Sequence, residues 1–338
     1  MPGSNGKDSV TEPSKKSRVA FWRRLITVLV SGLLLAFYVF RVDWAKLERA
    51  FMNADLWLFL AARVLPILLY LFVDAFLLQR LIVWYHKPFG YRHVLYGRAS
   101  LYIFALINAQ VSNGGMFIYL MRRAGIGAEK LMGLIVFRFA WSVWSINFGI
   151  TLALSAVFYL GLGFHSPIGM KLIIFGVAFI WSCLFLYLGL VFFIKRRYPA
   201  MKHRPFWTAF YQATPKHYLV MSSMTLLLAV SGVFSNYFCA VSFGIDIPFH
   251  ELVILLPIAD IISTLPVAFL GLGITTFAWQ TLFEPYATPE AFLSFTIALP
   301  VITYLIRALI ALAAMPAASK EIQLAFLKPD GADPGAEE

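Results

Sequence analysis

The sequence contains little charge. Asp, Glu, Lys and Arg make up 13% of its 338 residues, whereas hydrophobic residues make up 60% and aromatic residues 17%. Charged residues are about a quarter of a typical soluble protein, which needs them to cover its surface. The composition therefore excludes a soluble globular protein and predicts an integral membrane protein.

Residues that carry out chemistry are also scarce. The two cysteines, Cys183 and Cys239, lie within apolar runs, where neither a disulfide framework nor a metal cluster is expected. No Ser-His-Asp, Cys-His or paired-carboxylate arrangement is visible. We therefore expect no catalytic residues, no cofactor and no metal. Metal-ligand spacing is absent among the histidines of the predicted loops, which are His86, His93, His203 and His217.

Positive charge is in excess, with a formal net charge of +11 concentrated in a few loops. The sequence contains no motif for reading a nucleic-acid groove. Basic loops that flank apolar segments are typical of membrane topology and of contact with anionic lipid headgroups. We therefore expect a membrane lipid as the partner and no nucleic acid.

The apolar residues form eight segments, most of them long enough to cross about 30 Å of hydrocarbon at 1.5 Å per residue. The first lacks a following signal-peptide cleavage site, and we expect it to be retained. Residues 1–24 are polar and basic and are predicted to be a disordered cytoplasmic tail, and residues 319–338 an acidic cytoplasmic tail. The segments are residues 25–40, 56–83, 94–121, 131–160, 170–194, 218–243, 252–283 and 291–315.

Two of the eight segments contain residues that break helices. Residues 108–115 include Asn108, Ser112, Asn113 and the pair Gly114-Gly115, and residues 265–277 include Pro266, Gly271 and Gly273. Proline and glycine destabilise a helix, and a freed backbone group must be satisfied inside the membrane. Two broken segments in corresponding halves of a chain are typical of a transporter-like site.

The charges of the loops favour re-entrant hairpins for these two segments. If each hairpin enters and leaves on the same side of the membrane, the cytoplasmic loops and tails carry 20 Lys and Arg. The outer loops then carry three Lys and Arg and seven Asp and Glu. The positive-inside rule requires such an asymmetry. The predicted fold is all-α, with about six full spans and two hairpins. Residues 25–160 and 170–315 then form an inverted repeat, and both termini are cytoplasmic.

Charged residues lie inside the apolar segments, among them Arg63, Asp74, Arg138, Asp260 and Arg307, and each of these would cost at least about 2.5 kcal/mol at the bilayer centre. Arg138 and Arg307 are predicted about 10 Å from the cytoplasmic face, where they could receive an anionic headgroup. Alternatively, each could snorkel to the interface or pair with Asp74 or Asp260. We predict structural ion pairs for Arg63, Asp74 and Asp260.

The two breaks could themselves bind a ligand. A half-helix that begins after a break directs its unpaired amides toward the membrane interior and can hold a phosphate or carboxylate. The alternative is close helix packing through small residues. We list as binding candidates, with Arg138 and Arg307, the residues Asn108, Ser112, Asn113, Gly114, Gly115, Pro266, Gly271 and Gly273.

These motifs resemble those of the lysylphosphatidylglycerol synthase transmembrane region, a flippase-like family. The resemblance covers roughly residues 20–318. Its first motif is matched by Asn108, Gly114, Gly115, Arg122, Arg123 and Gly125, followed by Arg138, and its second by residues 263–266, Gly271-Leu272-Gly273 and then Arg307. The resemblance implies two re-entrant hairpins and a role in moving or binding a lipid.

The chain departs from the family pattern at three positions. Met116 and Thr276 stand where members often have acids, and Tyr119 stands where an arginine is usual. A mechanism that uses those charges would not operate here. Residues 316–338 form a short acidic tail that cannot supply an aminoacyl-transferase domain, so we expect no lipid aminoacylation by this chain alone.

The leading hypothesis is a protein of the bacterial cytoplasmic membrane that translocates or binds a phospholipid, polyprenyl or hopanoid-like lipid. A non-transporting membrane partner or anchor of a lipid- or envelope-modifying enzyme is the alternative. A membrane-embedded transferase is a third possibility, disfavoured by the missing acid–base residues. The sequence leaves the oligomeric state, the lipid and the energy source open.

Overall fold

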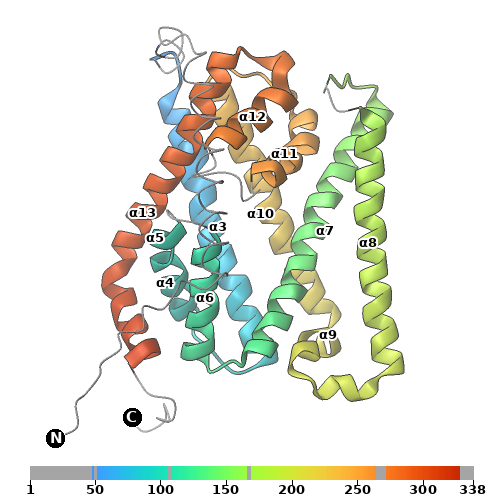
Figure 1. Cartoon of the computed structure of the whole chain (residues 1–338), viewed down its shortest axis with the longest axis vertical. Coiled ribbons are helices and arrows are strands. Elements are labelled where there is room, and N and C mark those ends of the chain that lie inside the picture. The colour runs from blue at the N-terminus through green and yellow to red at the C-terminus, as the bar shows by residue number, and fades with distance from the viewer. Residues whose placement is uncertain (1–47, 49–51, 106–108, 166–168, 264–271, 328–338) are drawn as a thin grey trace, which may run out of the picture.

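The computed structural model describes residues 48, 52–105, 109–165, 169–263 and 272–327, and within them every regular element is a helix (Figure 1). The elements in chain order are α3 (Leu56–Tyr85), α4 (Tyr91–Ser100), α5 (Tyr102–Ala105), α6 (Ala109–Ala124), α7 (Ala128–Leu160), α8 (Met170–Arg197), η1 (Pro199–His203), η2 (Pro205–Trp207), α9 (Thr208–Gln212), α10 (Pro215–Ser242), α11 (Phe249–Ser263), α12 (Leu272–Phe283), η3 (Glu284–Tyr286) and α13 (Pro289–Leu327).

Five of these helices, α3, α7, α8, α10 and α13, are long and apolar enough to cross a membrane. They coincide with five of the eight predicted segments, so the prediction of an all-α, multi-pass membrane protein is confirmed. The first predicted segment, residues 25–40, lies outside the described residues, as does the tail 1–24. Helix α13 extends to Leu327, into the segment predicted as a C-terminal tail.

The two segments with helix breakers form shorter helices at opposite ends of the molecule (Figure 1). We call the end where α3 finishes and α7 begins the lower end, as drawn, and the other the upper end. Helices α4, α5 and α6 lie in the lower half, where α4 packs between α3 and α13. Helices α11 and α12 lie in the upper half. The five long helices alternate in direction between the two ends.

The helix boundaries follow from local sequence. The Asp55 side chain caps α3 by accepting a hydrogen bond of 3.0 Å from the Leu58 backbone N–H. Thr214 caps α10, and Pro215 follows at the first helical position, where its missing N–H costs nothing. Helix α7 ends at Gly161, whose φ of +62° belongs to the left-handed region that glycine adopts without strain.

The first break lies earlier than the sequence indicated. The prediction that the chain turns at Gly114-Gly115 is wrong, because α6 begins at Ala109 and runs through both glycines. Gly115 packs closely within the hairpin: a Cβ there would lie 2.9 Å from Leu101 Cδ2. A glycine pair can therefore serve helix packing instead of a turn. At the second break, α12 begins at Leu272, beside the glycines that were predicted to mark it.

The upper end contains the largest apolar core, formed by α3, α7, α10, α11, α12 and α13. Trp279 on α12 is 2% exposed and packs edge-on against Phe295 of α13, with 4.7 Å between ring centroids. Glu251 on α11 is fully buried and accepts a hydrogen bond of 2.9 Å from the His165 backbone N–H. These contacts fix the α11–α12 hairpin against the long helices.

At the lower end, α7 passes very close to the short helix η2. A Cβ built on Gly133 would lie 2.0 Å from the backbone oxygen of Phe206, a distance that no side chain permits. We therefore expect Gly133→Ala to lower the free energy of unfolding by about 1–3 kcal/mol, because the backbone of α7 or η2 would have to move.

Thermal unfolding of the purified protein in detergent measures this effect. Gly149→Ala on the same helix is the matched control, since a Cβ there meets nothing within 4 Å and the change should be neutral or stabilising by about 0.5–1 kcal/mol. Equal melting temperatures for the two variants would contradict the close approach of α7 and η2.

Candidate functional site

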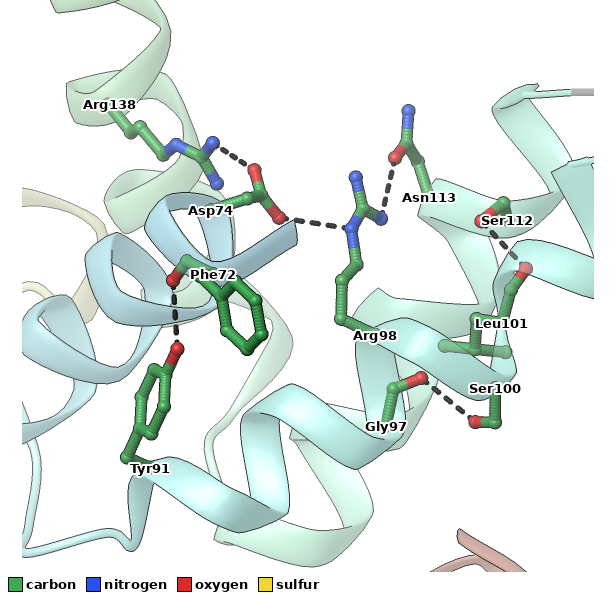
Figure 2. A network of polar contacts seen from close by, with 10 residues as sticks. All are labelled: Phe72, Asp74, Tyr91, Gly97, Arg98, Ser100, Leu101, Ser112, Asn113 and Arg138. Atoms are coloured by element: carbon green, nitrogen blue, oxygen red, sulfur yellow. Dashed lines mark hydrogen bonds and ion pairs between the residues drawn. The ribbon is translucent and has the colours of Figure 1, made fainter. Parts of the chain in front are cut away.

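A buried carboxylate joins three helices in the lower half of the molecule (Figure 2). Asp74 on α3 is 1% exposed. Its Oδ2 lies 3.0 Å from Nε of Arg98 on α4, and its Oδ1 accepts a hydrogen bond from Nη2 of Arg138 on α7. One aspartate therefore neutralises one of two buried guanidinium groups and connects α3, α4 and α7.

The α4–α6 hairpin supplies further polar contacts around Arg98 (Figure 2). Nη1 of Arg98 donates to Oδ1 of Asn113 on α6 at 3.0 Å. The neighbouring Ser112 hydroxyl, which is buried, donates to the backbone oxygen of Leu101 at 2.9 Å. Ser112 and Asn113, both predicted as binding residues, therefore connect α6 to α4 and α5.

These residues meet because of where each lies along its helix. Asp74 lies 11 residues before the lower end of α3, and Arg138 lies 10 residues after the start of α7. At 1.5 Å per residue, both are about 15 Å from the lower ends of their helices. Arg98 lies in the last turn of α4, at the inner end of the hairpin. The three charges therefore come together deep between the helices.

Arg307 on α13 adds a third guanidinium to the same region. Its Cζ lies 5.5 Å from the ring centroid of Tyr102 on α5, within the range of a cation–π contact. Tyr102 interacts electrostatically with Arg98, Arg307 and Asp74. We call Asp74, Arg98, Arg138 and Arg307 the arginine cluster. Three guanidinium groups against one carboxylate leave an excess of two positive charges.

Two polar atoms beside the arginine cluster lack hydrogen-bond partners. Among the described residues, neither the Tyr102 hydroxyl oxygen nor Nε of Arg307 makes a hydrogen bond, although both atoms are buried. Buried polar groups in folded proteins nearly always have a partner, so an exception calls for a ligand, an ion or a water. Because the local charge is positive, the missing partner is best supplied by an anion.

Arg63 lies on the same face of α3 as Asp74, three turns nearer the upper end. Its Nε donates to the Thr303 hydroxyl at 2.7 Å and its Nη1 to the Ser235 hydroxyl at 3.2 Å, so it connects α3 to α13 and α10. Asp260, exposed on α11, interacts with Arg63 electrostatically and makes no ion pair with it within 4.0 Å.

The structure brings together only some of the predicted binding residues. Arg138, Arg307, Ser112 and Asn113 lie in or beside the arginine cluster. Gly114 lies in α6 with open space around it and Gly115 packs against Leu101, while Gly273 falls in the first turn of α12. The remaining predicted residues, Asn108, Pro266 and Gly271, lie outside the described residues.

A family model described as the lysylphosphatidylglycerol synthase TM region matches residues 24–311, from before α3 into α13. The chain belongs to this family. The predicted resemblance is thereby confirmed, and with it a membrane protein related to lipid modification or translocation. A comparison with curated proteins gives no match.

The three departures from the family pattern all lie in packed regions. The hydroxyls of Thr276 and Thr296 are 2.7 Å apart between α12 and α13. Met116 is 4% exposed in the hairpin core. Tyr119 is 2% exposed, and its hydroxyl donates to the backbone oxygen of His93 at 3.0 Å. In this family member these positions therefore contribute to helix packing, and the charge of the site comes from the arginine cluster.

Sequence reasoning missed Arg98 and Tyr102. Arg98 was counted among the charges of a cytoplasmic loop, although it lies inside the predicted apolar segment 94–121. That position was the available signal, because a charge within an apolar segment is a functional candidate by default. Tyr102 gave no comparable signal, since tyrosines are common in this sequence and most need no ligand.

Removal of the central carboxylate should destabilise the protein strongly. Asp74→Ala leaves Arg98 and Arg138 buried beside each other without a counter-ion, so we expect a loss of about 3–5 kcal/mol in the free energy of unfolding. Arg98→Gln should cost less, because the Asp74–Arg138 pair remains. Chemical unfolding in detergent micelles, followed by circular dichroism, measures both.

Asp55→Ala is the matched control for the loss of an aspartate. Asp55 is exposed and caps α3, so its removal should cost only about 1 kcal/mol. An Asp74→Ala variant no less stable than Asp55→Ala would show that the arginine cluster does not hold α3, α4 and α7 together.

Proposed function

We propose that the protein binds the anionic headgroup of a membrane lipid at the arginine cluster and translocates that lipid across the bacterial cytoplasmic membrane. One observation carries the proposal: the Tyr102 hydroxyl and Nε of Arg307 are buried beside an excess of positive charge and have no hydrogen-bond partner among the described residues. A phosphate group would supply both the negative charge and the acceptors.

The members of the arginine cluster would have different roles. Arg98 and Arg138 contact Asp74, so they hold the helices together and supply positive charge. Arg307 and Tyr102 would contact the headgroup directly. A guanidinium suits this role because it stays charged and presents several donors in the plane that phosphate oxygens match.

Two re-entrant hairpins would give the headgroup access from both sides of the membrane. In this proposal α4–α6 enters from the lower end and α11–α12 from the upper end, as their positions in Figure 1 suggest. The lower end carries the basic last turn of α8, Lys195-Arg196-Arg197, which the positive-inside rule assigns to the cytoplasm. The polar residues Arg63 and Asp74 then line α3 between the hairpins.

The transport proposal predicts that Tyr102→Phe and Arg307→Gln lower the rate of lipid movement about tenfold or more, since a hydrogen bond to a charged group contributes about 1.5–3 kcal/mol. Movement of fluorescent phosphatidylglycerol between the leaflets of liposomes that contain the protein measures the rate. Both variants should purify in wild-type amounts.

Arg80→Gln is the matched control, because Arg80 is an exposed α3 arginine that lies over the ring of Phe76, outside the arginine cluster. Wild-type rates in both Tyr102→Phe and Arg307→Gln would remove the arginine cluster from the mechanism. A wild-type protein that moves no phosphatidylglycerol would refute translocation of a glycerophospholipid.

The orientation of the hairpins makes a separate prediction. Gly127 precedes α7 at the lower end and Gly169 precedes α8 at the upper end, and a side chain at either position meets nothing within 4 Å. Single cysteines placed there, in a chain whose Cys183 and Cys239 are replaced by serine, should react with a membrane-impermeant thiol reagent from opposite sides. Labelling of both from one side would contradict the proposed topology.

A further inference from the structure

A second candidate site lies between α7, α8, α9 and α10, away from the arginine cluster. It is a cavity of about 160 Å³, and eight of its twelve lining residues are aromatic. We call it the aromatic groove. Its indole rings belong to Trp141 and Trp144 of α7 and Trp181 of α8, and the phenol rings of Tyr187 and Tyr218 lie nearer the lower end.

The walls of the aromatic groove are held by contacts of their own. Trp141 and Trp144 meet edge to face with 5.8 Å between ring centroids, and Trp144 stacks on Phe148 at 5.1 Å. The indole N–H of Trp181 donates to the Thr151 hydroxyl at 2.9 Å, which fixes α8 against α7. These contacts hold the rings in place, so binding would cost little side-chain entropy.

Hydrocarbon is the material that suits this groove. Three of the four helices that line it, α7, α8 and α10, are candidate membrane spans, and the apolar stretch of α8 has no buried residue. Water gains little in an apolar cavity, where it finds too few polar partners. The cavity also lacks a charged side chain among its lining residues, so a charged headgroup cannot occupy it. A lipid chain can.

The lower end of the groove lies close to a basic segment. Val191 lines the groove, and one helical turn later α8 ends in Lys195-Arg196-Arg197. Nζ of Lys195 lies 5.8 Å from the ring centroid of Tyr211, the neighbour of the groove residue Phe210. Arg196 and Arg197 are exposed. Positive charge therefore lies where the headgroup of a lipid in the groove would emerge.

We propose that the aromatic groove and the basic end of α8 form a binding site for one anionic phospholipid, with an acyl chain among the aromatic rings and the phosphate at Lys195 and Arg196. This site lies on the α8 side of α7, whereas Arg138 reaches Asp74 on α3. It is therefore separate from the arginine cluster and does not depend on the proposed translocation.

Tryptophan fluorescence tests the site without any transport assay. The delipidated protein in detergent is titrated with phosphatidylglycerol or phosphatidylcholine whose acyl chains carry bromine, which quenches tryptophan on contact. We expect saturable quenching with phosphatidylglycerol at a concentration about tenfold lower than with phosphatidylcholine. The preference follows from the attraction of about two basic residues for the anionic headgroup.

Separate variants test the groove and the basic end of α8. Ala140→Phe fills the groove and should abolish the saturable quenching, whereas Ala178→Phe, at an exposed α8 position outside the groove, should not. Lys195→Gln combined with Arg196→Gln should make the two lipids quench at similar concentrations. Lys87→Gln with Arg92→Gln removes two other lower-end charges, one from the connection between α3 and α4 and one from the first turn of α4, and should leave the preference intact.

Two results would overturn the proposal. Equal quenching by both lipids in the wild type would show that the basic segment selects no headgroup. Unchanged quenching in Ala140→Phe would show that the lipid binds elsewhere, and Leu188→Phe, which fills the groove from α8, repeats this test if Ala140→Phe does not fold. Neither result bears on the arginine cluster, so the two proposals can fail separately.

Discussion

The buried carboxylate of Asp74 is the interaction on which the lower half of this protein depends. It lies between guanidinium groups from α4 and α7, so it fixes the α4–α6 hairpin against two long helices. Inside a membrane the hydrophobic effect does not drive helices together, because lipid chains are as apolar as the helix surfaces. A charge network of this kind therefore gives the hairpin a defined position that apolar packing alone would not.

The same network has a consequence for function. Asp74 pairs with two guanidinium groups and Arg307 adds a third nearby, so the arginine cluster holds the helices together and still keeps an excess of positive charge. Arg307 and Tyr102 lie at the edge of this network with polar atoms that no described residue satisfies. Structure and ligand binding are thus divided among neighbouring residues: Asp74 organises the site, and the residues beside it are available to an anion. The aromatic groove differs from the arginine cluster, because no charged residue lines it and the nearby charge lies in the last turn of α8.

Several of the sequence predictions failed or stayed ambiguous for identifiable reasons. Glycine was interpreted as a turn at Gly114-Gly115, but helix α6 tolerates it because Gly115 allows close contact with Leu101. Arg98 was assigned to a loop because the end of an interrupted apolar segment cannot be located from hydropathy alone. Arg138 could be interpreted either as a ligand contact or as the partner of Asp74. Either role places a single arginine within an apolar segment, so the sequence does not distinguish them.

The sequence by itself determined that this is an all-helical, multi-pass membrane protein, because apolar length and scarcity of charge leave no other way to satisfy the backbone in lipid. It also determined the two interrupted segments and the family. Only the tertiary structure decided which arginines meet Asp74, that α6 passes straight through its glycines, and that aromatic residues of α7, α8 and α10 enclose a groove. These features depend on how helices distant in the chain pack against each other, and the spacing of residues within one segment carries no information about that.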